Sequence, residues 1–362
     1  MKFFSYLLLF LTVSFSCIEK GEKKPLNPDN KVASASKDAL AFTSGIRAIL
    51  KDSKGFFWFG SMQEGLCRYD GNSFVYYTTK DGLADNQIRS IQEDSEGTLW
   101  LGTGNGVCSY DGKSFTIHTA IEEKTSGEWF PVQKDKAQSK WMKKSTDLWF
   151  NAGIKEGIYR YDGEHLHYLP FPEQSAKSTG NVYSVTDFSH GQNNMLWIGT
   201  FAGVFGFDGK DFITINNEAL EIETDEAPVH IRSVLEDSKG RLWIGNNGIG
   251  VLLKQEENIT NFSEEQGLIH PNSSRRGDPS PPGTLEHVFC ITEDRTGNIW
   301  FADRDAGVWK YDGKNMINYT TKDGLTSNFA QSIYEDPTGV LWFGLVDGNL
   351  CTFNGKSFDS RF

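Results

Sequence analysis

A tryptophan-centred repeat runs through most of the chain and restricts the possible folds more than any other feature. Two neighbouring copies read Ile46-Arg-Ala-Ile-Leu-Lys-Asp-Ser-Lys-Gly-Phe-Phe-Trp-Phe-Gly60 and Ile88-Arg-Ser-Ile-Gln-Glu-Asp-Ser-Glu-Gly-Thr-Leu-Trp-Leu-Gly102. The tryptophan of this repeat recurs at Trp58, Trp100, Trp149, Trp197, Trp243, Trp300 and Trp342. Spacings of about 40 to 50 residues are the blade period of β-propellers. We therefore expect an all-β, seven-bladed β-propeller with four-stranded antiparallel blades.

Each repeat reads as four short strands with turn residues between them. The order is a strand, an Asp-x-x-Gly turn, the tryptophan strand, a third strand, an Asp-Gly or Asn-Gly hairpin and a last aromatic strand. The hairpin pairs predict two-residue turns with positive φ, and the tryptophans predict rings packed between adjacent blades. Blade 3 departs most from the pattern, with an inner strand expected over 129–135. The stretch 357–362 reads as the outer strand of blade 7, and 40–43 is an alternative strand for that blade, so the way in which the ring closes stays open.

The first residues resemble an export signal. Lys2 precedes an apolar stretch that is too short to span a bilayer and ends in Ser14-Phe15-Ser16-Cys17. We interpret 1–17 as a signal peptide with a lipobox-like end, 18–44 as a flexible tether of polar composition, and 45–362 as the propeller. Cys17 is then the predicted lipidation site and membrane anchor. The alternative is ordinary secretion with cleavage nearby.

Composition and motifs exclude several functions. The formal net charge of -12 argues against nucleic-acid binding, which requires a basic surface. Cys67, Cys108 and Cys351 share one repeat position that hydrophobic residues fill elsewhere, so we expect free buried thiols, with Cys290 on a different strand. His165 and His167 would lie on one strand face, but no third ligand is placed near them, and we expect no metal site. No catalytic motif is present, and we expect no cofactor.

Aligning the repeats predicts rings of residues at one mouth of the central channel. The residue that begins each inner strand is Gly45, Gln87, Glu128, Asn181, His230, His287 and Phe329. The residue two positions later in each strand is Arg47, Arg89, Phe130, Tyr183, Arg232, Phe289 and Gln331. From these two rings we take as candidate ligand-binding residues Arg47, Arg89, Phe130, Tyr183, His230, Arg232, His287, Phe289 and Gln331. Guanidinium groups bind carboxylates, sulfates and phosphates through paired donors, so the channel is predicted to take an anionic ligand.

Two other readings of these residues stay open. The arginines could instead pair with turn carboxylates such as Glu93-Asp94 and Glu236-Asp237 and hold the blades together. The loop 267–286, which contains Arg275 and Arg276, could overhang the same mouth, as long loops on a rigid scaffold often carry function.

The repeat Ile-Arg-Ser-Ile-x-Glu-Asp-Ser-x-Gly-x-Leu-Trp-x-Gly-Thr, followed by Gly-Val-x-x-Tyr-Asp-Gly, resembles the two-component regulator propeller repeat. The linkers that begin at Thr79 and Thr321, Thr-Lys-Asp-Gly-Leu, are similar to that family as well. In the family such repeats form periplasmic sensor regions of hybrid histidine kinases of Bacteroidetes, many of which respond to glycans. The sequence ends inside the last blade, so we expect a free-standing relative without a kinase or DNA-binding segment.

The resemblance implies a sensing or regulatory binding module in the cell envelope, lipid-anchored on the periplasmic or outer-membrane face. Its expected partner is a glycan or other anionic small molecule, or an envelope protein. The alternative is an enzyme similar to the streptogramin lyases, with His287 as the acid or base, and a scaffolding role is a third possibility.

Overall fold

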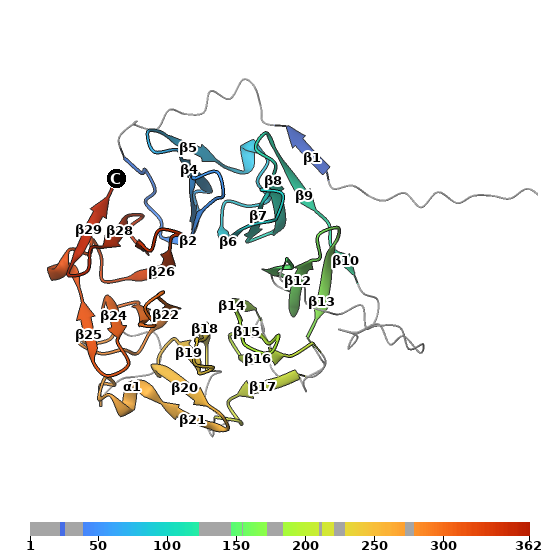
Figure 1. Ribbon diagram of the computed structural model, residues 1–362. Helices are drawn as coiled ribbons and strands as arrows, with labels where there is room; N and C mark the ends of the chain where they lie inside the picture. The colour runs from blue at the N-terminus through green and yellow to red at the C-terminus, as the bar shows by residue number, and fades with distance from the viewer. Residues whose placement is uncertain are drawn as a thin grey trace, which may run out of the picture.

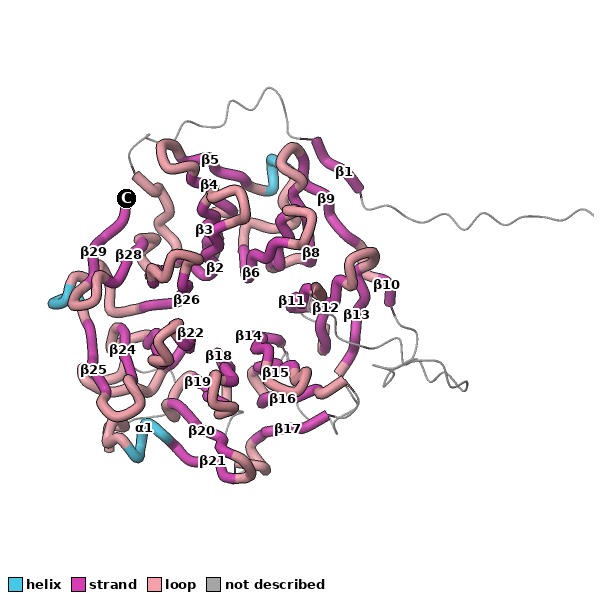
Figure 2. Tube along the Cα trace, in the orientation of Figure 1, coloured by secondary structure: helices cyan, strands magenta, loops and turns pink. Residues whose placement is uncertain are grey.

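Seven β-sheets surround a central opening in the computed structural model of the chain (Figure 1). The structure describes residues 22–25, 39–122, 146–153, 155–171, 184–209, 212–220, 229–271 and 279–362. Each sheet is one sequence repeat, and its first strand lies nearest the centre where that strand is described (Figure 2). The predicted seven-bladed propeller is confirmed.

Blades 1 to 4 form the first four of the seven blades in the ring. From the centre outward, blade 1 consists of β2 (Ile46–Lys51), β3 (Phe57–Ser61), β4 (Leu66–Tyr69) and β5 (Phe74–Tyr77), and blade 2 consists of β6 (Ile88–Glu93), β7 (Leu99–Thr103), β8 (Gly106–Tyr110) and β9 (Ser114–His118). The described strands of blade 3 are β11 (Leu148–Asn151), β12 (Gly157–Tyr161) and β13 (Leu166–Pro170). Blade 4 consists of β14 (Val185–His190), β15 (Leu196–Thr200), β16 (Gly203–Phe207) and β17 (Phe212–Asn216).

Two short strands extend these sheets at their outer edges. β1 (Glu22–Pro25), within the stretch expected as a tether, pairs antiparallel with β9. β10 (Ile121–Glu122) pairs parallel with β13. The inner strand expected for blade 3 at 129–135 lies outside the described residues, so β11 is the strand of this blade that lies nearest the centre in the described part.

Blades 5 to 7 complete the ring. Their strands are β18 (Ile231–Glu236), β19 (Leu242–Asn246), β20 (Val251–Gln255) and β21 (Asn258–Asn261) in blade 5; β22 (Val288–Glu293), β23 (Ile299–Asp303), β24 (Val308–Tyr311) and β25 (Met316–Tyr319) in blade 6; and β26 (Ala330–Glu335), β27 (Leu341–Leu345), β28 (Leu350–Phe353) and β29 (Phe358–Arg361) in blade 7. Helical turns occur at α1 (Phe262–Glu265) and in the 3-10 helices Thr79–Asp81 and Thr321–Asp323.

The Glu-Asp pair of the repeat, present in blades 2, 5, 6 and 7, explains how such a blade is built and joined to its neighbour. In blade 6, Asp294 accepts hydrogen bonds from the backbone N–H groups of Thr296 and Asn298 and, at 2.8 Å, from the indole N–H of Trp300. Glu293 accepts bonds from the backbone and hydroxyl of Ser238 in blade 5, at 2.7 and 2.6 Å. The aspartate therefore fixes the turn and its tryptophan, while the glutamate clamps the preceding blade.

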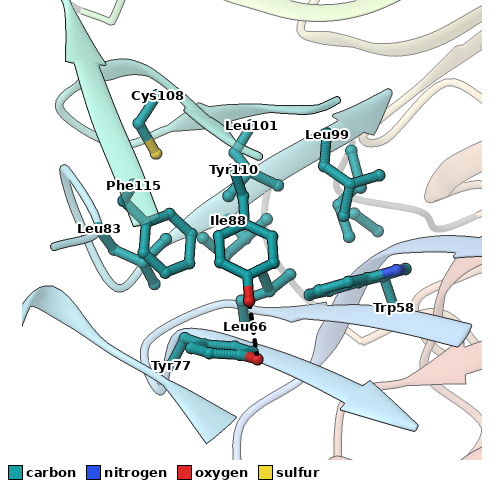
Figure 3. Close-up of a cluster of buried hydrophobic side chains, with 12 residues drawn as sticks. Trp58, Leu66, Tyr77, Leu83, Ile88, Leu99, Leu101, Cys108, Tyr110 and Phe115 are labelled. Carbon is teal, nitrogen blue, oxygen red and sulfur yellow. Dashed lines mark hydrogen bonds between the residues drawn. The ribbon is translucent and has the colours of Figure 1, made fainter. Parts of the chain in front are cut away.

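Hydrophobic side chains fill the spaces between blades. All seven repeat tryptophans are buried, as predicted. Figure 3 shows one such layer, where Trp58 and Tyr77 of blade 1 face Tyr110 and Phe115 of blade 2. Burial of a large ring of this kind stabilises the fold by a few kcal/mol. Cys67, Cys108 and Cys351 are free and buried within these layers, as predicted, and Cys290 is also free.

The hairpin turns differ from the prediction. Gly71 has φ 96°, but Asp70 is not among the residues with positive φ, and the strands resume pairing only at Tyr69 and Phe74. The loop therefore has four residues rather than two. The Asp70 carboxylate causes this, because it accepts hydrogen bonds from the backbone N–H groups of Asn72 and Ser73 and stabilises an Asx-type turn.

Blades 1 and 7 join without exchange of a strand. β29 is the outer strand of blade 7, so 357–362 fills the place that 40–43 was considered for. At the joint, the Ser332 hydroxyl donates to the carbonyl of Ile46 at 2.8 Å, and the ring of Phe362 packs against Tyr69 at 4.5 Å. Side-chain packing and hydrogen bonds therefore close the ring.

Candidate ligand-binding channel

The inner strands enclose a cavity of about 480 Å³, which adjoins a second one of about 220 Å³. Both cavities share a polar wall that consists of Arg47, Arg89, Ser90, Thr186, Asp187 and Arg232. Blades 1, 2, 4 and 5 contribute these residues. The combined volume is in the range of small-molecule sites in proteins.

A repeated β-bulge directs the channel residues inward. In blade 1, Ile46 pairs with Ser61 and Ala48 with Gly60, which leaves Arg47 as the extra residue between them. Six described inner strands have the same irregularity at the same position. A bulge twists the strand and re-aims the side chain, and this is how a sheet edge presents a polar residue to the channel.

The bulge positions test the ring that the sequence alignment predicted. They are occupied by Arg47, Arg89, Thr186, Arg232, Phe289 and Gln331, so five of the nine candidate residues lie in the cavity wall. Tyr183 and Phe130 lie outside the described residues. Strand pairing gives the blade 4 position to Thr186, which corrects the alignment that placed Tyr183 there.

A constant spacing could have found this position. The bulge residue precedes the repeat tryptophan by eleven residues in every pairing, as in Arg89 with Trp100 and Thr186 with Trp197. The repeat alignment instead placed the blade 4 residue three positions earlier, at Tyr183.

The three arginines have different surroundings. Arg89 donates from Nη1 to the amide oxygen of Asn151 at 2.7 Å and from Nε to that of Gln87 at 2.9 Å. Arg232 lies over the rings of Phe201 and Phe289, at 5.1 and 4.7 Å. Within the described residues, neither Arg47 nor Arg232 has a hydrogen-bond or ion-pair partner.

The alternative that these arginines pair with turn carboxylates is wrong for the described carboxylates. Asp237 receives the indole N–H of Trp243 and the Nε of Arg241, both from its own turn. Glu236 receives the backbone N–H of Gln192 and the indole N–H of Trp197 from blade 4. The turn carboxylates hold the blades together, which leaves the channel arginines available.

Burial and mutual repulsion act on the channel cations. The pKa of Arg47 is lowered by burial and by the nearby charge of Arg89, and burial also lowers the pKa of Arg89. Burial lowers the pKa of Arg232 to about 10, with further effects from Arg47 and Arg304. An anion between these groups would relieve the repulsion, so the electrostatics favour anion binding.

Asp187 is the carboxylate in the wall of both cavities. It accepts hydrogen bonds from the Ser233 hydroxyl at 2.6 Å and from the backbone N–H of Val234 at 3.1 Å. Burial raises its pKa to about 6 despite these bonds. Its charge therefore changes in the mildly acidic range, in a cavity wall that also contains Arg47, Arg89 and Arg232.

The two histidines proposed for the mouth do not line either described cavity. His230 has φ 54° and packs edge-on against Phe201, and burial with the nearby Arg232 lowers its pKa to about 4. His287 is 2% exposed, and its Nδ1 lies 2.7 Å from the Ser280 hydroxyl and 3.1 Å from Asp305. Both contacts use the same ring nitrogen, so this arrangement cannot relay a proton from serine to aspartate through the ring.

The remaining candidates add no second site. Cys17, Arg275 and Arg276 lie outside the described residues. His167 is 3.0 Å from Asp162, and within the described part of the chain no group of three or more metal-ligating side chains is found. Of the described helices, none has the length and apolar character to cross a membrane.

The fold and channel define a seven-bladed propeller with a cationic central cavity. Three stretches, 82–105, 226–248 and 324–347, match the family described as two component regulator propeller. These three stretches therefore match the two-component regulator propeller repeat, as the resemblance predicted. None of the curated proteins compared with the chain matched it.

Solved structures share the fold. The extracellular domain of a hybrid two-component system from B. thetaiotaomicron is 21% identical with a TM-score of 0.61, over 89% of this chain and 40% of that one. The extracellular domain of a one-component system from the same organism is 18% identical with a TM-score of 0.58, over 94% and 40%. Virginiamycin B lyase from Staphylococcus aureus is 14% identical with a TM-score of 0.58, over 92% and 98%. This chain thus spans 40% of the length of the two regulator domains.

Proposed function

We propose that the chain is a propeller sensing module of the cell envelope that binds a small anionic molecule in its central channel. The observation that carries this proposal is the pair Arg47 and Arg232, two cations in the wall of a 480 Å³ cavity with no anionic partner in the described residues. Carboxylates, sulfates and phosphates have the charge and the paired acceptors that guanidinium groups bind. An acidic glycan fragment is one ligand of this kind.

An envelope location is consistent with the sequence and with the structural relatives. The apolar N-terminal stretch that ends at Cys17 resembles a lipoprotein signal, and two structurally similar domains are extracellular parts of regulatory systems. We propose export followed by lipid anchoring at Cys17. The channel would then sample small molecules outside the cytoplasm, and a protein partner in the envelope would receive the response.

The lyase alternative gains no specific support. The likeness to virginiamycin B lyase concerns the fold, and His287 is buried against Ser280 and Asp305 rather than exposed to the cavity. A general acid or base must reach the substrate proton directly or through one water.

Thermal unfolding tests the proposed site. We expect sulfate, phosphate, citrate or galacturonate to stabilise the wild-type chain, by about 2.7 kcal/mol at about 100 times the Kd. The Arg47→Ala Arg232→Ala variant should lose the response. Arg295→Ala is the matched control, because Arg295 pairs with Glu335 on the surface and should leave the response unchanged. Equal responses in both variants, or no response to any anion in the wild type, would refute an arginine-based site.

A further inference from the structure

The wall of the larger cavity is asymmetric. Blades 1, 2, 4 and 5 contribute Arg47, Arg89, Arg232 and Asp187, whereas the stretch of the wall from blade 6 through blade 7 to Met62 of blade 1 is largely apolar. That stretch includes the apolar side chains of Phe289, Phe329, Met62 and Val346, together with Gln331, Ser332, Cys290 and Ile333. The first four side chains are partly exposed, so they form a hydrophobic surface inside a polar channel.

The apolar stretch is organised by aromatic contacts. The rings of Phe289 and Phe329 meet edge to face at 5.1 Å between centroids. Phe289 also lies against the guanidinium of Arg232 at 4.7 Å. The cation and the hydrophobic surface are therefore held next to each other, and a ligand that reaches Arg232 also reaches the phenyl groups.

This juxtaposition restricts the ligand. A sugar acid with many hydroxyl groups would lose hydrogen bonds to water on the apolar side. Gln331 and Ser332 are the hydrogen-bonding side chains of that stretch, and the Ser332 hydroxyl already donates to the carbonyl of Ile46. A ring without polar edges would instead gain contact area with Phe289 and Phe329, and aromatic pairs prefer this edge-to-face arrangement. Pockets that combine apolar walls with a few placed polar groups take amphipathic molecules.

We propose that the ligand of this channel is an aromatic anion, an aryl carboxylate or aryl sulfate, with its acidic group between the arginines and its ring on Phe289 and Phe329. This inference rests on the proposed function, because it assigns the ligand class of the same site. Phe329 is then a specificity-determining residue: it touches the ring of the ligand, while Arg47 and Arg232 hold the charge.

Three probes separate the charge from the ring. Phenyl sulfate and methyl sulfate carry the same anionic group with and without a ring, and galacturonate carries a carboxylate on a sugar. With isothermal titration of the full chain, we expect phenyl sulfate to bind about tenfold or more tightly than either of the other two. The Phe329→Leu variant should weaken phenyl sulfate about tenfold and leave methyl sulfate and galacturonate nearly unchanged.

Two further measurements show whether weaker binding in Phe329→Leu comes from the lost ring contact or from misfolding of the variant. The melting temperature of Phe329→Leu without ligand shows whether the variant is folded, and Met62→Ser removes a second apolar contact from the same wall without touching the aromatic pair. Both variants should selectively weaken phenyl sulfate.

The outcomes distinguish this inference from the proposed function. If galacturonate binds as tightly as phenyl sulfate, and its binding needs Arg47 and Arg232 but not Phe329, the aromatic ligand class is wrong while the anion site stands. If none of the three probes binds, both proposals fail. Tight, Phe329-dependent binding of phenyl sulfate supports both.

Discussion

Arg232→Met should make the ligand-free protein more stable, which is unusual for a substitution in a propeller core. Arg232 has no hydrogen-bond or ion-pair partner within the described residues, and its pKa is lowered to about 10 by burial and by other arginines. Each pKa unit corresponds to about 1.4 kcal/mol, so a charged Arg232 costs the fold about 3 kcal/mol. The cation–π contacts with Phe201 and Phe289 offset about 1 to 2 kcal/mol of this destabilisation.

The net expectation is a gain of about 1 to 2 kcal/mol in the free energy of unfolding, because methionine fills similar space without a charge. Urea denaturation at pH 7.5 and low salt measures this free energy, and the midpoint should rise while the slope stays constant. The matched control is Arg241→Met. Arg241 is in the same blade but pairs with Asp237 at 2.7 Å and lies over Trp243, so its loss should destabilise the protein.

The same urea denaturation is repeated with sulfate present, for the wild type and for Arg232→Met. In the wild type, sulfate should raise stability by binding to the arginines, whereas Arg232→Met should respond much less. A loss of more than about 1 kcal/mol in Arg232→Met without ligand would contradict this reasoning, because it would mean that the guanidinium is a structural group.

Three further outcomes are expected. Asp187→Asn should tighten sulfate binding about two- to tenfold at pH 7.5, because it removes a negative charge from the cavity wall. The wild type should bind sulfate more tightly below about pH 6, where Asp187 is protonated, and the variant should lose this pH dependence. Titration calorimetry from pH 5 to 7.5 tests both expectations. Asp294→Ala should cost about 2 to 4 kcal/mol in urea denaturation because it leaves the buried indole N–H of Trp300 unpaired, whereas Asp312→Ala in an exposed hairpin should cost much less. Phe362→Ala should lower stability by about 1 to 3 kcal/mol through the joint of blades 1 and 7, and equal melting temperatures of variant and wild type would contradict that role.

The repeat made most of the fold predictable from sequence. Turn residues, strand lengths and the tryptophan spacing all indicated the same blade, and this agreement between local and global patterns is why the seven-bladed ring was predicted correctly. The hairpin turns were misjudged because Asp70 acts through its side chain, which accepts two backbone N–H groups, rather than through a positive φ of its own.

The channel was harder to predict because it depends on register. The bulge residue and its neighbours line the cavity in the described inner strands, and an error of three positions in blade 4 exchanged Thr186 for Tyr183. The carboxylate of Asp187 was missed for the same reason, since the residues that correspond to it are Ala48, Ser90, Ser233, Cys290 and Ser332. Comparing every blade at a fixed distance from its tryptophan would have placed both residues in the ring.

The carboxylates at the turns and the arginines in the channel have different roles, and this difference explains why the channel can carry a function. Carboxylates at the turns, such as Glu293 and Asp294, hold the blades together far from the central cavity, and their pairing with backbone N–H groups and indoles is complete without the channel arginines. The lowered pKa values of Arg47 and Arg232 indicate that burial and nearby cations make both charges unfavourable in the fold. Unfavourable charges that the surrounding structure holds in place are a mark of functional sites, where the ligand supplies the missing partner. The same logic predicts that the bulge positions can vary between related propellers while the Glu-Asp pair stays in the blades that contain it, so that ligand specificity can change without loss of the fold.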